Sequence, residues 1–176
     1  MAFLAQLDSI DGRRLNLLQR LLLVNDGTLT DALEVAFLEP IALEKISMDV
    51  SSDGESPEAL EAKPDMRVMR RRILLRGAES GKAFVYAESW IALDRLPDGL
   101  REQLVSSESP IGRLWTEYKL ETRKQILRFW RQPAGELGKR FGIDTEAGLL
   151  ARSYRVFRCD SPIMIITEFF PAALGS

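Results

Sequence analysis

The segment that is most informative about the architecture is Arg152-Ser-Tyr-Arg-Val-Phe-Arg-Cys-Asp-Ser-Pro-Ile-Met-Ile-Ile-Thr-Glu-Phe-Phe-Pro171. It is typical of two strands joined by the polar turn Asp160-Ser161-Pro162. The second strand is almost wholly apolar, which predicts a central strand covered on at least one face. Because side chains alternate along a strand, one of its faces carries Met164, Ile166, Glu168 and Phe170.

Glu168 is therefore predicted to be a carboxylate among large apolar side chains. Burial of an unpaired carboxylate is costly, so such groups are paired, neutralised or used. The alternative is a solvated glutamate near a strand end. A cation on a facing apolar surface would favour the buried position.

The run Val68-Met-Arg-Arg-Arg-Ile-Leu-Leu75 supplies such a cation. A period of two places Arg71 with Met69, Ile73 and Leu75, whereas Arg70 and Arg72 reach water from the other face. A basic edge strand with all three arginines solvated remains the alternative. An arginine and a glutamate in one apolar space indicate a small, enclosed site for an anionic ligand.

Composition predicts one ordinary globular domain over residues 1–176, with 45% hydrophobic and 28% charged residues. The net charge of −2 gives no general attraction to nucleic acid or to anionic membranes. No run of about eighteen apolar residues occurs, so no membrane span is predicted. The first eight residues lack the features of a signal peptide, and the expected location is the cytoplasm.

Two features of the composition narrow the chemistry. There is no histidine, which excludes Ser-His and Cys-His nucleophilic machinery and imidazole metal sites. The single cysteine, Cys159, is predicted to be a small packing residue rather than a nucleophile. Catalysis would have to use carboxylates, arginine, lysine, hydroxyls and backbone amides, which favours proton transfer or elimination.

Two helix starts could present free backbone amides. A helix over 11–24, stopped by Asn25-Asp-Gly27 with Gly27 as a left-handed cap, is followed by a second helix. Thr28 is its predicted N-cap, with Asp31 as a capping-box partner, which leaves the amides around Leu29 at the helix start. Ser109-Pro-Ile-Gly112 predicts another capped helix, where Ile111 would offer its amide. Both helices could equally be ordinary, with starts that face water.

The remaining pattern predicts an α+β fold with a single antiparallel sheet. Strands are expected over 41–50, 68–75 and 82–93, where Glu88 is a second candidate acid. Residues 121–131 favour a strand over a helix. An exposed loop is expected over 51–65, a short helix over 97–106, and a broken helix and loop over 133–150.

These residues resemble the chorismate pyruvate-lyase (4-hydroxybenzoate synthase) family, in a divergent branch of it. The similarity runs from about Asn25 to Pro171. Its motifs are Asn25-Asp-Gly-Thr-Leu-Thr30, Arg71-Arg-Ile-Leu-Leu75, Ala87-Glu-Ser-Trp-Ile-Ala-Leu-Asp-Arg-Leu-Pro97, Ser109-Pro-Ile-Gly112 and Pro162-Ile-Met-Ile-Ile-Thr-Glu-Phe-Phe170. Each is weak alone, but the five occur in the family's order. Residues 131–149 align poorly.

The resemblance implies a single antiparallel sheet with helical flaps over an internal ligand site, and no metal or cofactor. The family's ligand-binding positions fall on Leu29 and Ile111 (through their amides), Arg71 and Glu168. The implied reaction converts chorismate to 4-hydroxybenzoate and pyruvate, for quinone or phenolic-lipid synthesis. Arg71 and Glu168 would be catalytic. The alternative is a sensor domain of the same fold, which binds small aromatic acids without turnover.

Overall fold

Antiparallel pairing joins the strands of this protein into a single sheet. The computed structural model describes residues 2–8, 10–52, 55–106 and 111–175. Within them the sheet has six strands in the order β1-β2-β3-β6-β5-β4. The strands are β1 (Ile41–Ser51), β2 (Val68–Gly77), β3 (Ala83–Ala92), β4 (Arg123–Pro133), β5 (Gly148–Arg158) and β6 (Ser161–Pro171). The apolar strand β6 is central, as its sequence predicts, and the α+β fold class is confirmed.

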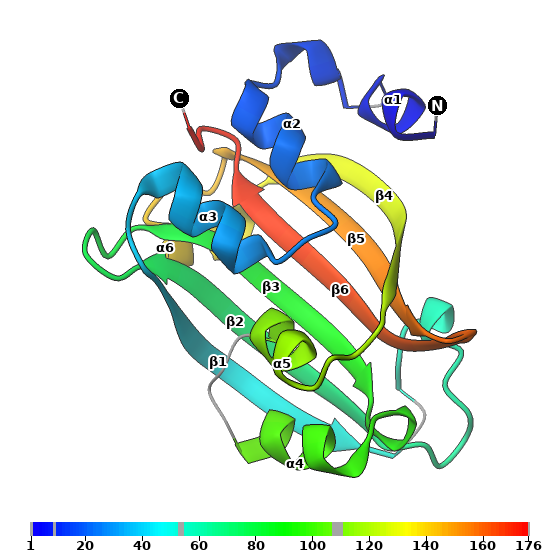
Figure 1. The fold of residues 1–176 in the computed structure, drawn as a ribbon. Helices are drawn as coiled ribbons and strands as arrows, with labels where there is room; N and C mark the ends of the chain where they lie inside the picture. The colour runs from blue at the N-terminus through cyan, green and yellow to red at the C-terminus, as the bar shows by residue number, and fades with distance from the viewer. Residues whose placement is uncertain (1, 9, 53–54, 107–110, 176) are drawn as a thin grey trace.

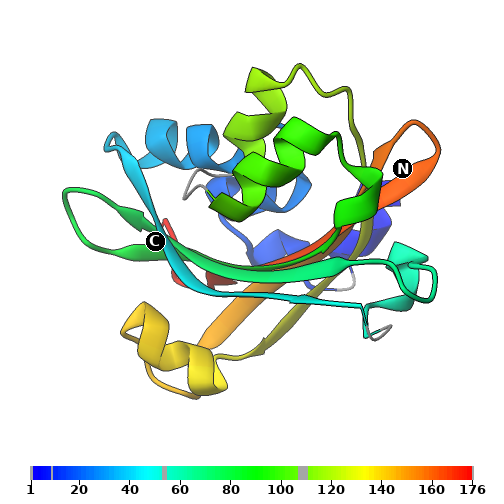
Figure 2. The ribbon, with the colours of Figure 1, turned by 90° about the horizontal axis from the view of Figure 1, so that it is seen from below.

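Helices cover both faces of this curved sheet. The helices are α1 (Ala2–Asp8), α2 (Leu17–Val24), α3 (Leu29–Phe37), α4 (Asp98–Ser106), α5 (Ile111–Glu117) and α6 (Gly138–Phe141). Figures 1 and 2 show α3, α4 and α5 on the concave face, and α6 on the opposite face. No helix of the described chain is long and apolar enough to span a lipid bilayer.

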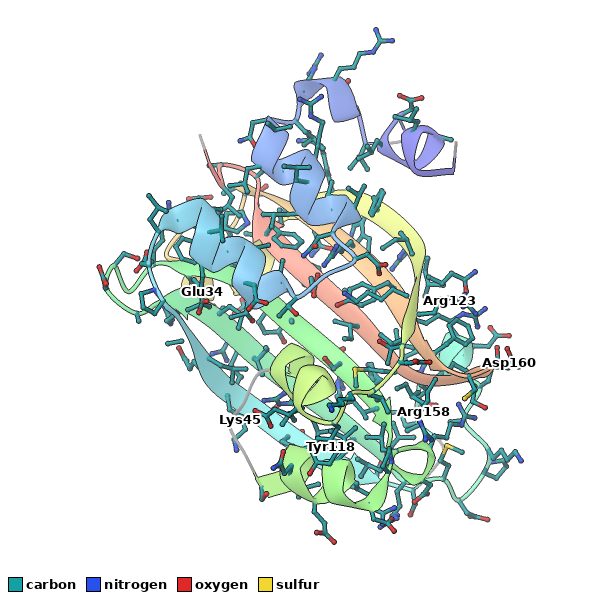
Figure 3. The ribbon with its side chains drawn as sticks, in the orientation of Figure 1. Glu34, Lys45, Tyr118, Arg123, Arg158 and Asp160 are labelled. Carbon is teal, nitrogen blue, oxygen red and sulfur yellow. The ribbon has the colours of Figure 1, made fainter. Side chains whose placement is uncertain are left out.

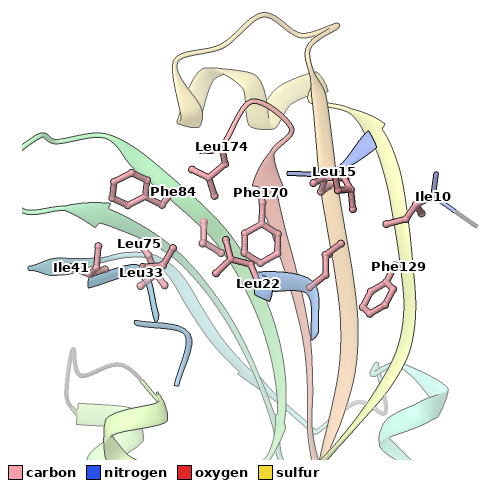
Figure 4. Close-up of a cluster of buried hydrophobic side chains, with 13 residues drawn as sticks. Ile10, Leu15, Leu22, Leu33, Ile41, Leu75, Phe84, Phe129, Phe170 and Leu174 are labelled. Atoms are coloured by element: carbon pink, nitrogen blue, oxygen red, sulfur yellow. The ribbon is translucent and has the colours of Figure 1, made fainter. Parts of the chain in front are cut away.

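The apolar core on the concave face anchors α2 and α3 at one end of the sheet (Figure 4). Leu22 and Leu33 pack there with Phe170, the last residue of the alternating face of β6. Phe37 at the end of α3 stacks on Phe84 of β3 with ring centroids 4.1 Å apart. Full burial of such side chains contributes about 1.5–3 kcal/mol each. These contacts hold α3 on the sheet, and Leu29 at the start of α3 also packs against this core.

The first predicted helix is shorter than expected. Residues Gly12–Arg14 form a 3-10 turn, and α2 begins only after Asn16. Asn16 and Gln19 form a reciprocal capping box, with their side chains 2.9 and 3.0 Å from each other's backbone nitrogen. This cap fixes the start of α2 at Leu17 because it satisfies two backbone donors at once.

The predicted caps after α2 are partly wrong. Gly27 is not in the left-handed region; α2 ends instead at Asn25, whose Oδ1 accepts a hydrogen bond from the Gly27 amide at 3.0 Å. This side-chain turn replaces a glycine cap. Thr28 is the N-cap residue of α3, but its side chain makes no capping hydrogen bond, so the capping box with Asp31 is not formed.

Three other boundaries differ from the sequence prediction. The turn between β5 and β6 lies at Cys159 and Asp160, with Cys159 exposed at φ 51°, so the prediction of a packing cysteine is wrong. Figure 3 shows Arg158 and Asp160 at this end of the sheet, away from α2 and α3. Residues 148–150, which were expected in the helix and loop over 133–150, belong to β5. Leu60, in the loop that was expected to be exposed, is buried in the 3-10 turn Glu58–Leu60.

Candidate active site

A cavity of about 200 Å³ lies between the concave face of the sheet and the helices above it. The sheet contributes Ile73, Leu75, Ala87, Ser89, Lys124, Tyr154, Val156, Ile166 and Glu168. The covering segments contribute Asp26, Gly27, Thr28, Leu29, Thr30, Ile111 and Gly112, and Thr122 precedes β4. The cavity is smaller than the roughly 300–1,000 Å³ of drug-sized sites, so it suits a small ligand.

Glu168 lies on the floor of the cavity, with 4% of its surface exposed. Its burial agrees with the alternation of β6, but its cation is not the predicted one. Arg152, its partner across the β5–β6 ladder, donates from Nε to one Glu168 oxygen at 2.5 Å. The Tyr154 hydroxyl donates to the other oxygen at 2.8 Å. The adjacent strand therefore supplies the counter-ion of Glu168, an arginine that the sequence analysis did not single out.

Arg152 and Tyr154 are buried parts of the site that the sequence reasoning missed. Arg152 is fully buried, and its Nη1 also donates to the carbonyls of Leu23 and Asn25 at 3.1 and 2.9 Å. Its Nη2 has no hydrogen-bond partner among the described residues. Burial, followed by the charge of Glu168, raises the pKa of the Tyr154 phenol well above its ordinary value, so this hydroxyl stays a donor.

Arg71 is buried on the same face as Glu168, with 1% of its surface exposed. Its ladder partner is Ser89, which pairs in turn with Ile166, two residues before Glu168. Both partners line the cavity, so Arg71 lies beside it on the β2 side. Burial lowers the pKa of the Arg71 guanidinium, yet an arginine remains protonated in proteins.

Arg70 and Arg72 lie on the opposite face, as the alternation predicts. Both contact Glu88, with nitrogen–oxygen distances of 3.0 and 2.8 Å. Burial opposes ionisation of Glu88, but Arg72 and Arg70 outweigh it and lower the pKa of this carboxyl. The interpretation of Glu88 as a second candidate acid is wrong, since the sheet separates it from the cavity.

Leu29 and Ile111 are the first residues of α3 and α5, and both line the cavity. The predicted cap residues Ser109 and Pro110 lie outside the described residues. The two helix starts approach each other closely: a Cβ added to Gly112 would lie 2.9 Å from Cγ2 of Thr28. A glycine at this position therefore lets α5 approach the start of α3 without displacing the Thr28 side chain.

Lys124 is a further cation at the cavity that the sequence reasoning missed. Its ammonium group donates to the carbonyls of Asp26 and Gly27 at 2.6 and 2.8 Å, and lies 5.6 Å from the centre of the Tyr154 ring. Burial lowers the pKa of this ammonium. The alternation predicted for residues 121–131 could have placed Lys124 on the same face as Ile126.

The arrangement combines a buried carboxylate, two hydrogen-bond donors that hold it, and cations on both sides of a mainly apolar cavity. Such a site can orient an anionic ring and exchange a proton with it. Among the described residues, no three His, Cys, Asp or Glu side chains gather where they could hold a metal ion.

Several solved structures share this fold at low sequence identity. PhnF from Mycobacterium smegmatis superposes with a TM-score of 0.66 at 14% identity, over 84% of this chain and 65% of that one. The ligand-binding domain of a GntR-family regulator from Bordetella bronchiseptica gives a TM-score of 0.60 at 18% identity, over 74% and 85% of the two chains. At these identities the likeness shows the fold alone.

Two curated proteins have a higher sequence identity to this chain than these solved structures have. The chain is 32% identical over 165 residues to the chorismate pyruvate-lyase of Mycobacterium tuberculosis, covering 90% of this chain and 81% of that protein. It is also 32% identical over 162 residues to the chorismate pyruvate-lyase of Mycobacterium leprae, covering 90% and 76%. The family model for chorismate pyruvate-lyases of the Rv2949c-like type matches residues 23–176. The protein therefore belongs to the Rv2949c-like chorismate pyruvate-lyase family.

Proposed function

We propose that this protein is a chorismate pyruvate-lyase that releases 4-hydroxybenzoate and pyruvate, acting as one domain over residues 1–176 in the cytoplasm. The observation that carries the proposal is Glu168: a buried carboxylate held by Arg152 and Tyr154 on the floor of a small cavity. The family membership of the chain and the names of its relatives support the same substrate.

The reaction is an elimination that needs no co-reactant. The bond between the ring and the ether oxygen breaks, and the ring carbon that bears the hydroxyl loses its proton. The ring becomes aromatic 4-hydroxybenzoate, while the departing enolpyruvate takes up a proton on carbon and becomes pyruvate. Aromatisation supplies the driving force, so the protein has to orient the ring, balance charge and move one proton. We therefore propose that no metal or cofactor takes part.

Glu168 is placed to act in the proton transfer. Each of its oxygens accepts one hydrogen bond, from Arg152 or from Tyr154, and each keeps a lone pair for substrate. We assign it to the edge of the ring that carries the hydroxyl and the leaving group, as acid, base or orienting group. A positioned group of this kind contributes about 10²–10⁴-fold to the rate.

The remaining contacts bind the anionic substrate. Arg71 would neutralise the ring carboxylate from the β2 side through forked, charge-assisted hydrogen bonds. The amides of Leu29 and Ile111, at two helix starts that line the cavity, would cradle oxygen atoms of the substrate. A flat product in a covered apolar cavity would leave slowly, which makes product release a candidate for the rate-limiting step.

A binding domain without turnover is the second candidate, favoured by the likeness to the ligand-binding domain of a GntR-family regulator. Incubation of the purified protein with chorismate separates the two candidates. We expect the absorbance of 4-hydroxybenzoate to rise, with an equal amount of pyruvate. A rise of the melting temperature with chorismate or 4-hydroxybenzoate, but with no product, would instead establish the binding domain.

A further inference from the structure

Lys124 lies on the edge strand β4, on the other side of the cavity from Arg71. It lies on β4, whereas Arg71 lies on β2, and β3, β6 and β5 run between those two strands. Four strand spacings of about 4.8 Å separate the two strands by roughly 19 Å. The sheet between them is curved (Figure 2). Lys124 lines the cavity itself, and Arg71 lies beside the lining residue Ser89, so the two cations flank the cavity from its two sides.

The charges around the cavity leave Lys124 available to an anion. Glu168 already has Arg152 as its counter-ion. Of the described residues that line the cavity, Lys124 alone carries a positive charge, and the other charged ones are Glu168 and the exposed Asp26. The ammonium of Lys124 has three donors, and the described contacts with the carbonyls of Asp26 and Gly27 use two of them.

The position of Lys124 indicates which part of a substrate it would meet. Its ammonium lies against Tyr154, whose hydroxyl binds Glu168. If Glu168 faces the edge of the ring that carries the hydroxyl and the leaving group, Lys124 lies beside that same edge. Chorismate carries a second carboxylate there, on its enolpyruvyl group.

We propose that Lys124 binds the enolpyruvyl carboxylate of chorismate, while Arg71 neutralises the ring carboxylate. This assignment rests on the proposed function. It makes Lys124 a residue that selects a dicarboxylate over a monocarboxylate, because 4-hydroxybenzoate keeps only the ring carboxylate. Lys124 also ties the segment before α3 to β4 through the carbonyls of Asp26 and Gly27.

The test compares ligands with two carboxylates and with one. In Lys124→Met the KM for chorismate should rise about ten- to a hundredfold, as expected for a lost charge-assisted hydrogen bond. The inhibition constant of 4-hydroxybenzoate should change by less than about threefold, and Lys124→Arg should recover part of the chorismate affinity. Lys139→Met is the matched control, because Lys139 on α6 has 75% of its side chain exposed on the other face of the sheet.

Two results would overturn the proposal: an unchanged KM for chorismate, or an equal loss of affinity for both ligands. The second would mean that Lys124 only holds the segment before α3. If the wild-type protein releases no pyruvate, the proposed function fails separately. Calorimetric titration of intact chorismate into wild type and Lys124→Met then still tests Lys124, and equal affinities would contradict its role.

Discussion

At the residue scale, the site depends on a carboxylate whose two oxygens are held by different kinds of donor. Arg152 offers a charge, and Tyr154 offers a neutral hydroxyl whose pKa is raised by burial first and by Glu168 second. Together they orient the carboxylate and still leave lone pairs towards the cavity. The buried position of Glu168 could be predicted from alternation along β6. Its partner could not, because that depends on which strand lies next to β6 and in which register.

Replacement of Glu168 by glutamine should separate chemistry from binding. Glu168→Gln keeps the shape and most of the hydrogen-bonding capacity but loses the charge, so turnover should fall by about 10²–10⁴-fold. Binding of 4-hydroxybenzoate should be partly retained. Steady-state kinetics and product titration measure both effects. Glu88→Gln, on the far face of the sheet, is the matched control and should keep near-normal turnover.

Loss of Arg152 should act mainly on stability. Arg152→Met leaves Glu168 buried without its counter-ion, which costs about 3–5 kcal/mol of unfolding free energy. The side chains of the pair are 0% and 5% exposed, so solvent screens the interaction little. Denaturant unfolding measures the loss, with the exposed Arg158→Met as control. The double variant with Glu168→Leu should recover most of the stability; a double variant as unstable as the single one would contradict this account.

The pH dependence of substrate binding should report on Lys124. Burial lowers the pKa of its ammonium most; Glu168 and Asp26 raise it, and Arg152 lowers it. The protonated form binds a carboxylate, so chorismate affinity should fall as the pH rises through this lowered pKa, earlier than for a lysine in water. Measurement of the KM for chorismate at increasing pH checks this loss of affinity. Lys124→Arg should not show the loss, because arginine stays protonated.

At the element scale, the sequence predicts the strands of the sheet more accurately than the helices that cover it. Alternation predicts β1, β2, β3, β4 and β6 within a few residues, because one face of each strand must be buried. The start of α2 and the turn at Cys159 depend on side-chain caps and backbone angles that several patterns would allow. The close approach of α5 to α3 depends on long-range packing, and only Gly112 hinted at it.

Closure of the cavity should be sensitive to a single methyl group at Gly112. Gly112→Ala places a Cβ 2.9 Å from Cγ2 of Thr28, so either the Thr28 side chain rotates or the start of α5 moves away from α3. We expect a higher KM for chorismate with a small change in melting temperature. Thr28→Ser removes the opposing methyl group, so the double variant should regain affinity. Equal KM values for Gly112→Ala and wild type would show that this contact does not shape the site.

At the scale of the whole molecule, one fold serves both ligand-binding domains and the lyase family. The sheet and its helices place a small cavity on the concave face, which suits either use. We propose that the chemistry depends on a few buried charges: Arg71, Arg152, Glu168 and the partly buried Lys124. Alternation predicted two of these four, because Arg71 and Glu168 stand among apolar neighbours in β2 and β6. Arg152 and Lys124 lie in more polar strands, where alternation alone does not distinguish a buried cation from a solvated one.

The most direct test of the central claim is the stoichiometry of the two products. Wild-type protein mixed with chorismate should release 4-hydroxybenzoate, followed by its absorbance, and pyruvate, followed by enzymatic reduction, in a ratio of one to one. Both rates should fall together in Glu168→Gln. Pyruvate without 4-hydroxybenzoate, a different aromatic product, or equal rates in the variant would contradict the account.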